Sequence, residues 1–402
     1  MSFKFIKINA PFHSYNRKFD DPQYENISYK NMKEEIEWDA VFLNGSWAYY
    51  LNKLGYNAQE IYTTVQPLQL KWAKEHGVAV DHSSWKTQIA LEQIKFFKPE
   101  IVYSSDWDMP ILKKVREEIP SVKLIIGELG SYIPPLDGWE VCDCIVDPAP
   151  EAVQYLKGKG FPAVHLNYGI DPRWLERIKT TELNFDFTFS GALLLTPGTH
   201  RNRIEVLDAV IRKFRGIRIG IFTDKNQIEE HIRKYSNLSW KALLKRKIKI
   251  YLGFKSNNKK DLVWPRKKRI NKKAINRIIA HNLGEVYGID MLGIFQQSKI
   301  VFNVHASSSP THASNFRLFE ATLAGSCLLT DRKDNLPELF EPEKEVVTYR
   351  SVDEAVDKVR YLLRSEDERK AIAEAGQRRI LRDHTLEIRA MELDEIIRRF
   401  LK

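Results

Sequence analysis

Short apolar runs alternate along the chain with longer segments in which apolar residues recur every three or four positions. In the first part of the chain the short runs fit buried strands and lie at residues 3–8, 57–63, 100–105, 122–126, 144–146 and 163–166. The segments with helical spacing lie between them, at 28–55, 68–76, 84–97 and 149–157. Strands that alternate with helices predict a parallel sheet covered on both faces, and therefore the α/β class.

A second series of the same kind follows a break at residues 167–172. Its strands are expected at 185–191, 217–222, 300–303, 326–330 and 346–349, and its helices at 203–214, 289–297, 351–363, 366–379 and 386–400. A chain of 402 residues is too long for one ordinary core. We therefore expect an N-terminal domain over 1–175 and a C-terminal domain over 176–385.

Residues 300–331 are the most informative stretch, because they read as strand, polar loop, short helix, glycine stop and strand. Ser314 or Asn315 can cap the helix, and Gly325 can end it. In an open parallel sheet, ligands bind outside the carboxyl ends of the strands and at helix N-termini. A ligand site is therefore expected around Asn303, His305, Asn315, Arg317 and Glu320.

The composition is that of a folded, water-soluble protein, with 43% hydrophobic and 29% charged residues. The chain has no stretch of roughly 20 apolar residues that would span a membrane, and its first residues do not resemble a signal peptide. The three cysteines argue against a disulfide framework, and Cys142 and Cys144 lack the second pair that a zinc site needs. These features predict a cytoplasmic protein.

The net charge of +10 is concentrated in one segment. Residues 233–277 contain 17 Lys or Arg and one acidic residue, whereas the remainder has 46 basic and 52 acidic residues. Apolar residues recur at helical spacing among the lysines from Trp240 to Leu252, which is typical of a helix that lies on an anionic membrane surface. The alternative is a solvated, charged insertion. Nucleic-acid binding is a third possibility, but no recognisable reader motif accompanies the charge.

Several motifs in the second half resemble those of the CgeB/YkvP-like glycosyltransferases. They are Asn315-Phe-Arg-Leu-Phe-Glu-Ala with Gly325 and Leu328-Leu-Thr-Asp331, then Glu338-Leu-Phe-Glu-Pro342 and Tyr349-Arg-Ser351, and upstream Val286-Tyr-Gly288, Ser298-Lys-Ile300 and Phe189-Ser-Gly191. The resemblance implies the GT-B fold, with two Rossmann-like domains whose parallel sheets face each other across a cleft. It also implies a nucleotide-sugar donor held by the C-terminal domain, and a last helix (386–402) that returns to the N-terminal domain.

One motif departs from that pattern. Many retaining GT-B enzymes carry two glutamates eight positions apart, and Glu320 fits the second of them. The first position is occupied by His312. Whether the sugar is transferred with retention or inversion therefore stays open.

Candidate donor-binding residues follow from the chemistry of a departing diphosphate, which needs cations or helix N-terminal N–H groups when no metal is present. Gly191, after Ser190, would let the backbone approach a phosphate, and Arg203 or Arg201 would neutralise it. The alternative for Arg203 is a solvated side chain on a helix surface. Glu320 could accept both ribose hydroxyls, and the alternative is a surface pair with Arg317.

Four further residues complete the predicted donor site. Tyr287 and Gly288 could shape the base pocket or form an ordinary turn. His305 could hydrogen-bond the donor or serve as a structural histidine. Asn315 could face the donor with Arg317 or only cap the helix.

A general base is needed only for inversion, and it would come from the N-terminal domain. His13, Asp106, Asp108 and Glu128 all follow probable strands, and each of them could equally be an ordinary polar loop residue. Asp106 and Asp108 match the sequence of an Asp-x-Asp metal site, but the resemblance implies no metal.

The sequence therefore predicts a metal-independent glycosyltransferase without a cofactor, with a UDP, GDP, ADP or TDP sugar as donor. The acceptor would be a glycan, a lipid-linked molecule or a protein, in a pathway such as cell-surface polysaccharide biosynthesis at the inner face of the membrane. The alternatives are a non-catalytic glycan-binding or coat protein of the same fold, and a nucleic-acid-binding protein that acts through residues 233–277.

Overall fold

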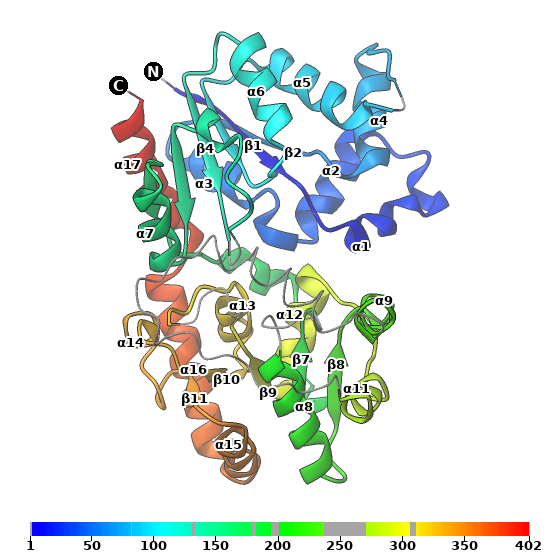
Figure 1. The fold of residues 1–402 in the computed structure, drawn as a ribbon, viewed down its shortest axis with the longest axis vertical. Helices are drawn as coiled ribbons and strands as arrows, with labels where there is room; N and C mark the ends of the chain where they lie inside the picture. Colours follow the sequence, from blue (N-terminus) through cyan, green and yellow to red (C-terminus); the bar gives the residue numbers. More distant parts are fainter. Residues whose placement is uncertain are drawn as a thin grey trace.

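The computed structural model describes residues 2–81, 83–130, 133–178, 182–193, 201–236, 271–305 and 311–401. The chain forms two lobes, one above the other in Figure 1, and each contains one parallel sheet flanked by helices. Most of the basic segment, residues 237–270, lies outside the described residues, and so does the helix expected around Trp240.

The first lobe contains a six-stranded parallel sheet in the order β2-β1-β3-β4-β5-β6. Its strands are β1 (Lys4–Asn9), β2 (Asn57–Tyr62), β3 (Ile101–Ser104), β4 (Leu124–Glu128), β5 (Cys144–Asp147) and β6 (Ala163–His165). Its helices are α1 (His13–Asn16), α2 (Tyr29–Trp38), α3 (Ser46–Lys53), α4 (Gln66–Glu75), α5 (Trp85–Phe97), α6 (Met109–Glu118) and α7 (Pro150–Gly158). Short 3-10 turns add η1 (Arg17–Asp20), η2 (Pro22–Tyr24), η3 (Val41–Leu43), η4 (Trp139–Val141) and η5 (Pro172–Arg177).

The second lobe contains a five-stranded parallel sheet in the order β11-β10-β9-β7-β8. Its strands are β7 (Phe185–Ser190), β8 (Ile219–Phe222), β9 (Ser298–Asn303), β10 (Cys327–Asp331) and β11 (Val347–Tyr349). Its helices are α8 (Arg201–Lys213), α9 (Lys225–Ser236), α11 (Lys272–Ile279), α12 (Gly288–Gln296), α13 (Arg317–Leu323), α14 (Leu336–Leu339), α15 (Val352–Arg364) and α16 (Glu366–Asp383). The last helix of the chain, α17 (Leu386–Phe400), packs on the first lobe. Both parallel sheets agree with the predicted α/β class.

Several elements differ from the sequence-based expectation, among them helices α9, α11 and α14, which were not predicted. Two differences in the first lobe have a clear physical reason. The helical segment expected over 28–55 is divided into α2, η3 and α3, because Ala40, Phe42 and Leu43 have left-handed backbone angles. Helix α6 was not expected, because Asp108 and Pro110 were read as loop residues. Pro110 instead lies in the first turn of α6, where its missing N–H costs no hydrogen bond.

One hydrophobic cluster joins the lobes. It contains Phe5 and Tyr103 of the first sheet, Trp174 of the connection, and Phe319 and Leu393 of helices α13 and α17. Helix α17 begins at the N-cap Thr385, whose hydroxyl accepts a hydrogen bond from the Ile388 N–H, and it runs back along the first lobe beside α3 and α7 (Figure 1). The exact boundaries of the two domains stay a prediction.

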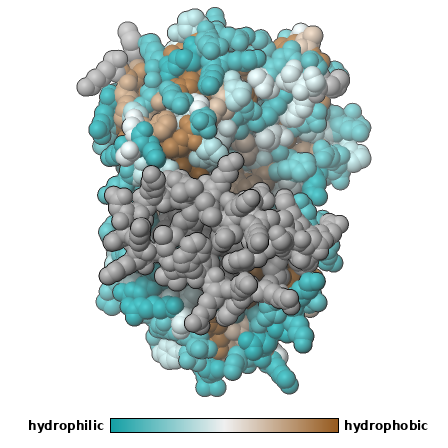
Figure 2. All heavy atoms as spheres, in the orientation of Figure 1, coloured by the Kyte–Doolittle hydropathy of each residue, from teal (hydrophilic) through white to brown (hydrophobic). Residues whose placement is uncertain are grey.

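The outer surface is mainly polar on the face that Figure 2 shows, with apolar residues in small patches among hydrophilic ones. Among the described helices, none is long and apolar enough to cross a bilayer. All three cysteines are buried and unpaired by disulfides.

A candidate nucleotide-sugar site between the lobes

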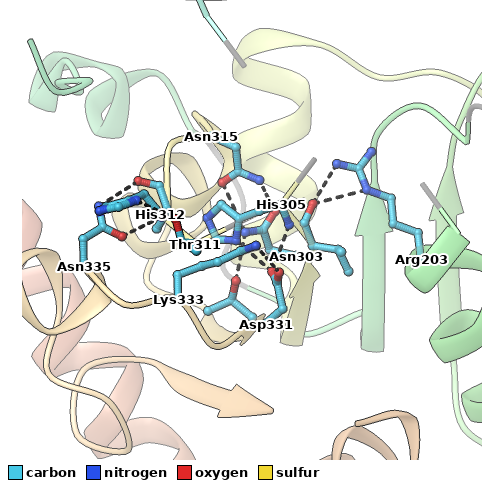
Figure 3. A network of polar contacts seen from close by, with 12 residues as sticks. Arg203, Asn303, His305, Thr311, His312, Asn315, Asp331, Lys333 and Asn335 are labelled. Atoms are coloured by element: carbon cyan, nitrogen blue, oxygen red, sulfur yellow. Dashed lines mark hydrogen bonds and ion pairs between the residues drawn. The ribbon is translucent and has the colours of Figure 1, made fainter. Parts of the chain in front are cut away.

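The loop between β9 and α13 is fixed to the second sheet by paired amides. Asn303 and Asn315 exchange hydrogen bonds of 2.7 and 3.2 Å, and Asn303 also donates to the Thr330 hydroxyl at 3.0 Å (Figure 3). Further along the loop, Asn335 accepts from the Ala313 N–H at 2.6 Å and donates to its carbonyl oxygen at 3.1 Å. Asn315 therefore helps to build the loop, whatever it contributes to a ligand.

His305 and Asp331, at the ends of β9 and β10, form a buried pair. One Asp331 oxygen accepts from the His305 N–H at 2.9 Å and lies 2.7 Å from Nδ1, and Lys333 Nζ lies 3.3 Å from the other oxygen. Burial alone would raise the pKa of Asp331, but its bonds with His305 and the charge of Lys333 lower it to about 2. His305 Nε2 is buried without a partner among the described residues, which leaves one ring nitrogen for a ligand.

Arg203, on α8, lies at the ends of β7 and β9. Its guanidinium donates to the Val304 carbonyl at 2.7 and 3.3 Å and to the Ala192 carbonyl at 2.9 Å (Figure 3). Burial and the nearby positive charge of Arg317 lower the pKa of Arg203 to about 10. The alternative of a solvated surface arginine is therefore wrong. Residue 201 lies on the same helix, but its side chain is outside the described ones.

Gly191, directly after β7, contributes a backbone conformation that other residues rarely adopt. Its φ is +151°, and a Cβ there would lie 3.8 Å from Nη1 of Arg203. The glycine keeps the backbone beside the guanidinium uncovered, and Ser190 ends the same strand in a buried position. This is the arrangement that close approach of a phosphate requires.

Arg317 and Glu320 form an ion pair of 2.7 Å in the first turn of α13. The pair is not the surface contact that was considered as an alternative, because the side chains are only 21% and 10% exposed. Arg317 also contacts the sulfur of Met291, and it lies over the Phe295 ring at 5.1 Å. Burial raises the pKa of Glu320 against the opposing charge of Arg317, and burial lowers the pKa of Arg317.

Tyr287 and Gly288 lie against the first lobe. The Tyr287 hydroxyl is 2.5 Å from the Ser14 hydroxyl and also donates to Glu285, and its ring packs edge-on against Tyr15. Gly288 has φ +51°, and a Cβ there would lie 1.7 Å from the Asp39 carbonyl oxygen. Both residues thus hold the lobes together, and their part in a base pocket stays a prediction.

The candidate bases of the first lobe share the carboxyl edge of its sheet. His13 is exposed on α1 after β1, whereas Asp106 after β3 accepts from Thr63 at 2.6 Å and pairs with Lys86 at 3.0 Å. Lys86 binds Asp108 at the same distance. Glu128 ends β4 with Lys7 3.9 Å away, and burial raises its pKa although Lys7 opposes the shift. None of the described residues forms a group of three or more His, Cys, Asp or Glu that could hold a metal ion.

A polar contact between the lobes was missing from the sequence-based prediction. Oε1 of Glu151, at the start of α7, accepts from the Thr311 hydroxyl at 2.9 Å and from the His312 N–H at 3.0 Å. It also lies 2.9 Å from Nδ1 of His312. The loop that precedes α13 is therefore bound from both sides, by Asn335 within its own lobe (Figure 3) and by Glu151 across the interface.

Comparison with known proteins agrees with this arrangement. Residues 233–395 match the profile of a family described as glycosyl transferase-like. Among solved structures, the chain is similar to a glycosyltransferase from Rickettsia africae, with 12% identity and a TM-score of 0.57 over 100% of this chain and 99% of that one. It is also similar to sucrose-phosphate synthase from Thermosynechococcus elongatus, with 9% identity and a TM-score of 0.56 over 99% and 98% of the two chains.

A third similar structure is that of Anabaena HepE in complex with UDP and glucose, with 10% identity, a TM-score of 0.54 and coverage of 98% and 99%. No curated protein matches the chain. The chain has the GT-B fold. Its two parallel sheets confirm the predicted fold class, and the family match lies in its C-terminal part.

Proposed function

We propose that the protein is a glycosyltransferase that moves a sugar from a nucleotide-activated donor to an acceptor. The second lobe would bind the donor, and the first lobe would bind the acceptor. The observation that carries this proposal is the buried set of Arg203, Arg317 and Glu320 at the carboxyl ends of β7 and β9. The family match and the GT-B fold support the same class of reaction.

The two arginines suit a diphosphate leaving group. Arg203 donates only to carbonyl oxygens among its recorded partners, and Arg317 is close enough to lower its pKa. Glu320 pairs with Arg317, whereas Arg203 has no carboxylate among its hydrogen-bond partners in the described part of the chain, and this favours the binding of an anion. Each forked guanidinium contact to a phosphate would be charge-assisted. No metal is needed for this step, so metal-independent transfer is part of the proposal.

Glu320 would bind the ribose. A carboxylate has about four acceptor sites, so it can pair with Arg317 and still accept two ribose hydroxyls. The unpartnered Nε2 of His305 would contact the donor phosphates or sugar, with its ring fixed by Asp331. Because HepE is known in complex with UDP and with UDP-glucose, UDP sugars are the first donors to test.

Among the predicted bases, Glu128 has the environment that favours the role, since burial raises its pKa toward the working range of a base. Asp106 is less suited, because Lys86 and Thr63 already bind its carboxylate. His13 lies exposed at the same edge and remains a candidate. The CgeB/YkvP-like assignment, the acceptor, and membrane or nucleic-acid binding through residues 233–277 stay predictions.

Isothermal titration with UDP, GDP, ADP and TDP tests the donor site. We expect Glu320→Ala to weaken the preferred nucleotide about 10- to 100-fold, because charge-assisted hydrogen bonds contribute about 1.5–3 kcal/mol. Glu320→Gln, which keeps the shape of the side chain, should lose less. The control is Glu374→Ala, which removes an exposed partner of Arg378 on α16.

If Glu320→Ala leaves the affinity of every nucleotide unchanged, the ribose assignment is wrong. Hydrolysis of the donor without acceptor separates an enzyme from the non-catalytic alternative, because a pure binding protein would release no free sugar.

A further inference from the structure

A small cavity lies in the first lobe between α3 and the carboxyl ends of β3, β4 and β5. Trp47, Tyr103, Glu128, Asp147 and Tyr168 are among the residues that line it. The volume of this cavity that is open to a water molecule is about 10 Å³. That volume is about the minimum that one water molecule occupies, and it is too small for a larger ligand.

Three polar atoms from this lining have no hydrogen-bond partner of ordinary geometry among the described residues. They are the indole Nε1 of Trp47, the hydroxyl of Tyr103 and Oδ2 of Asp147. The three residues are 3%, 0% and 1% exposed. A buried polar group without a partner costs about 1–3 kcal/mol, and three of them around one cavity call for a shared partner.

The chemistry of the three groups defines that partner. The indole N–H can only donate, a phenol hydroxyl both donates and accepts, and a carboxyl oxygen accepts or shares a proton. A cation does not suit the indole donor, and an anion is opposed by Glu128 and Asp147. A neutral group with two donors and two acceptors satisfies all three atoms, and only water is small enough.

We propose that this cavity binds one ordered water molecule, which accepts from Trp47 and bridges the Tyr103 hydroxyl to Asp147 Oδ2. The site does not depend on the proposed transferase activity. The carboxylate of Glu128 lies close enough to the Tyr103 hydroxyl to raise the pKa of Tyr103 by its charge and a weak hydrogen bond, in addition to burial, and this leaves the hydroxyl oxygen free to accept from the water. The water would thus join two buried carboxyl groups, on neighbouring strands, in one hydrogen-bonded set.

Because of the position of the cavity, the water would also support the interface between the lobes. Tyr168 lines the cavity, and its ring packs edge-on against Phe316 at 5.4 Å and Phe319 at 6.4 Å. Phe316 directly precedes α13, the helix that carries Arg317 and Glu320. The hydrated cavity therefore supports the wall against which the candidate donor helix packs.

A crystal structure of the unliganded wild-type protein tests the site directly. We expect one water within about 3.2 Å of at least two of the three atoms. An empty cavity, or a water that contacts fewer than two of the three atoms, would overturn the proposal. In solution, the Trp47 indole proton should show a nuclear Overhauser contact to a long-lived water, and absence of that contact also counts against the site.

Variants test the assigned partners. Tyr103→Phe should lower the occupancy of the water, and Trp47→Phe combined with Tyr103→Phe should abolish it, because an internal water needs two to four polar partners. Tyr24→Phe is the control, since Tyr24 is a buried tyrosine of the same lobe outside this cavity. A fully occupied water in the double variant would show that these partners are wrong. If the double variant does not fold, the wild-type structure still decides.

Discussion

The sheet edges on the two sides of the lobe interface hold ionisable groups of opposite kind, mainly basic on one side and acidic on the other. The edge of the second lobe holds the guanidinium groups of Arg203 and Arg317, with Glu320 as the one carboxylate that binds either of them among the described contacts. The edge of the first lobe holds Glu128 and Asp147, with Lys7 3.9 Å from Glu128. Burial lowers the pKa of the two arginines and raises the pKa of the two acids.

This difference suggests that the two edges bind different substrates. A guanidinium that donates only to carbonyl oxygens, as that of Arg203 does among the described residues, would be stabilised by a bound anion, so the second edge suits a nucleoside diphosphate. Burial favours the neutral form of Glu128 and Asp147, which suits neutral hydroxyl groups such as those of an acceptor or an internal water. The lobes can therefore face each other without placing the anionic donor beside an ionised acid.

The largest effect that this comparison predicts is at Asp147, and its absence would contradict the comparison. Burial, helped by the charges of Glu151 and Glu128, raises its pKa to about 8. In the unfolded chain the group ionises near its ordinary pKa of about 3.9, so its contribution to stability is complete below that pH and is lost as the pH rises toward 8. Asp147→Asn cannot ionise, and Oδ1 of an asparagine still accepts from the Ala149 N–H.

We therefore expect Asp147→Asn to gain stability over wild type as the pH rises from 4 to 8, by several kcal/mol at pH 8. Thermal unfolding at pH 4.5 and pH 8 measures the gain. The control is Asp137→Asn, which replaces an exposed aspartate in the same lobe and should show no such pH dependence. Equal differences from wild type at both pH values would contradict a protonated Asp147.

A smaller effect is expected from Arg203, which tests the cationic edge. Arg203→Gln should weaken the preferred nucleoside diphosphate about 30- to 100-fold, because one charge-assisted, forked contact is worth about 2–3 kcal/mol. Arg203→Lys keeps the charge without the fork and should fall between the variant and wild type. Titration calorimetry measures both, with the exposed Arg378→Gln as control. Unchanged affinity in Arg203→Gln would remove this residue from the donor site.

The sequence predicted the parts of the site that depend on local order. The apolar run that ends at Asn303 and the stop at Gly325 mark the strand and the end of the helix directly. The predicted cap is displaced by one residue: Phe316 is the N-cap of α13, although Asn315 Oδ1 still accepts from the Leu318 N–H at 3.3 Å. The resemblance of the motif around Glu320 then pointed to the donor helix.

Contacts between distant residues could not be read in the same way. Glu151 and Thr311 are 160 positions apart, and nothing in either neighbourhood indicates that they meet. Gly288 looked like a turn glycine, whereas its lack of a side chain serves close approach to the Asp39 carbonyl of the other lobe. The burial of the Arg317–Glu320 pair could not be predicted either, since a spacing of three residues on a helix is the same for a buried pair and an exposed one.

The smallest expected effect concerns the contact that joins the two edges. Glu151 binds Thr311 and His312 at the loop before α13. Burial alone would raise the pKa of Glu151, but its hydrogen bonds outweigh burial and lower the pKa. Glu151→Gln keeps an acceptor oxygen but removes the charge, which for a partly exposed pair is worth at most about 1 kcal/mol. We expect a two- to fivefold loss of nucleotide affinity, because the loop that positions α13 is then held less firmly.

The matched control is Glu387→Gln, which breaks the exposed pair of 3.2 Å between Lys53 on α3 and α17 and should leave nucleotide affinity unchanged. Small-angle scattering adds an independent measurement, since a weakened contact should increase the radius of gyration of Glu151→Gln more than that of the control. If Glu151→Gln matches wild type in both measurements, the two edges act independently, and the loop is positioned from within the second lobe by Asn335 and Asn303 alone.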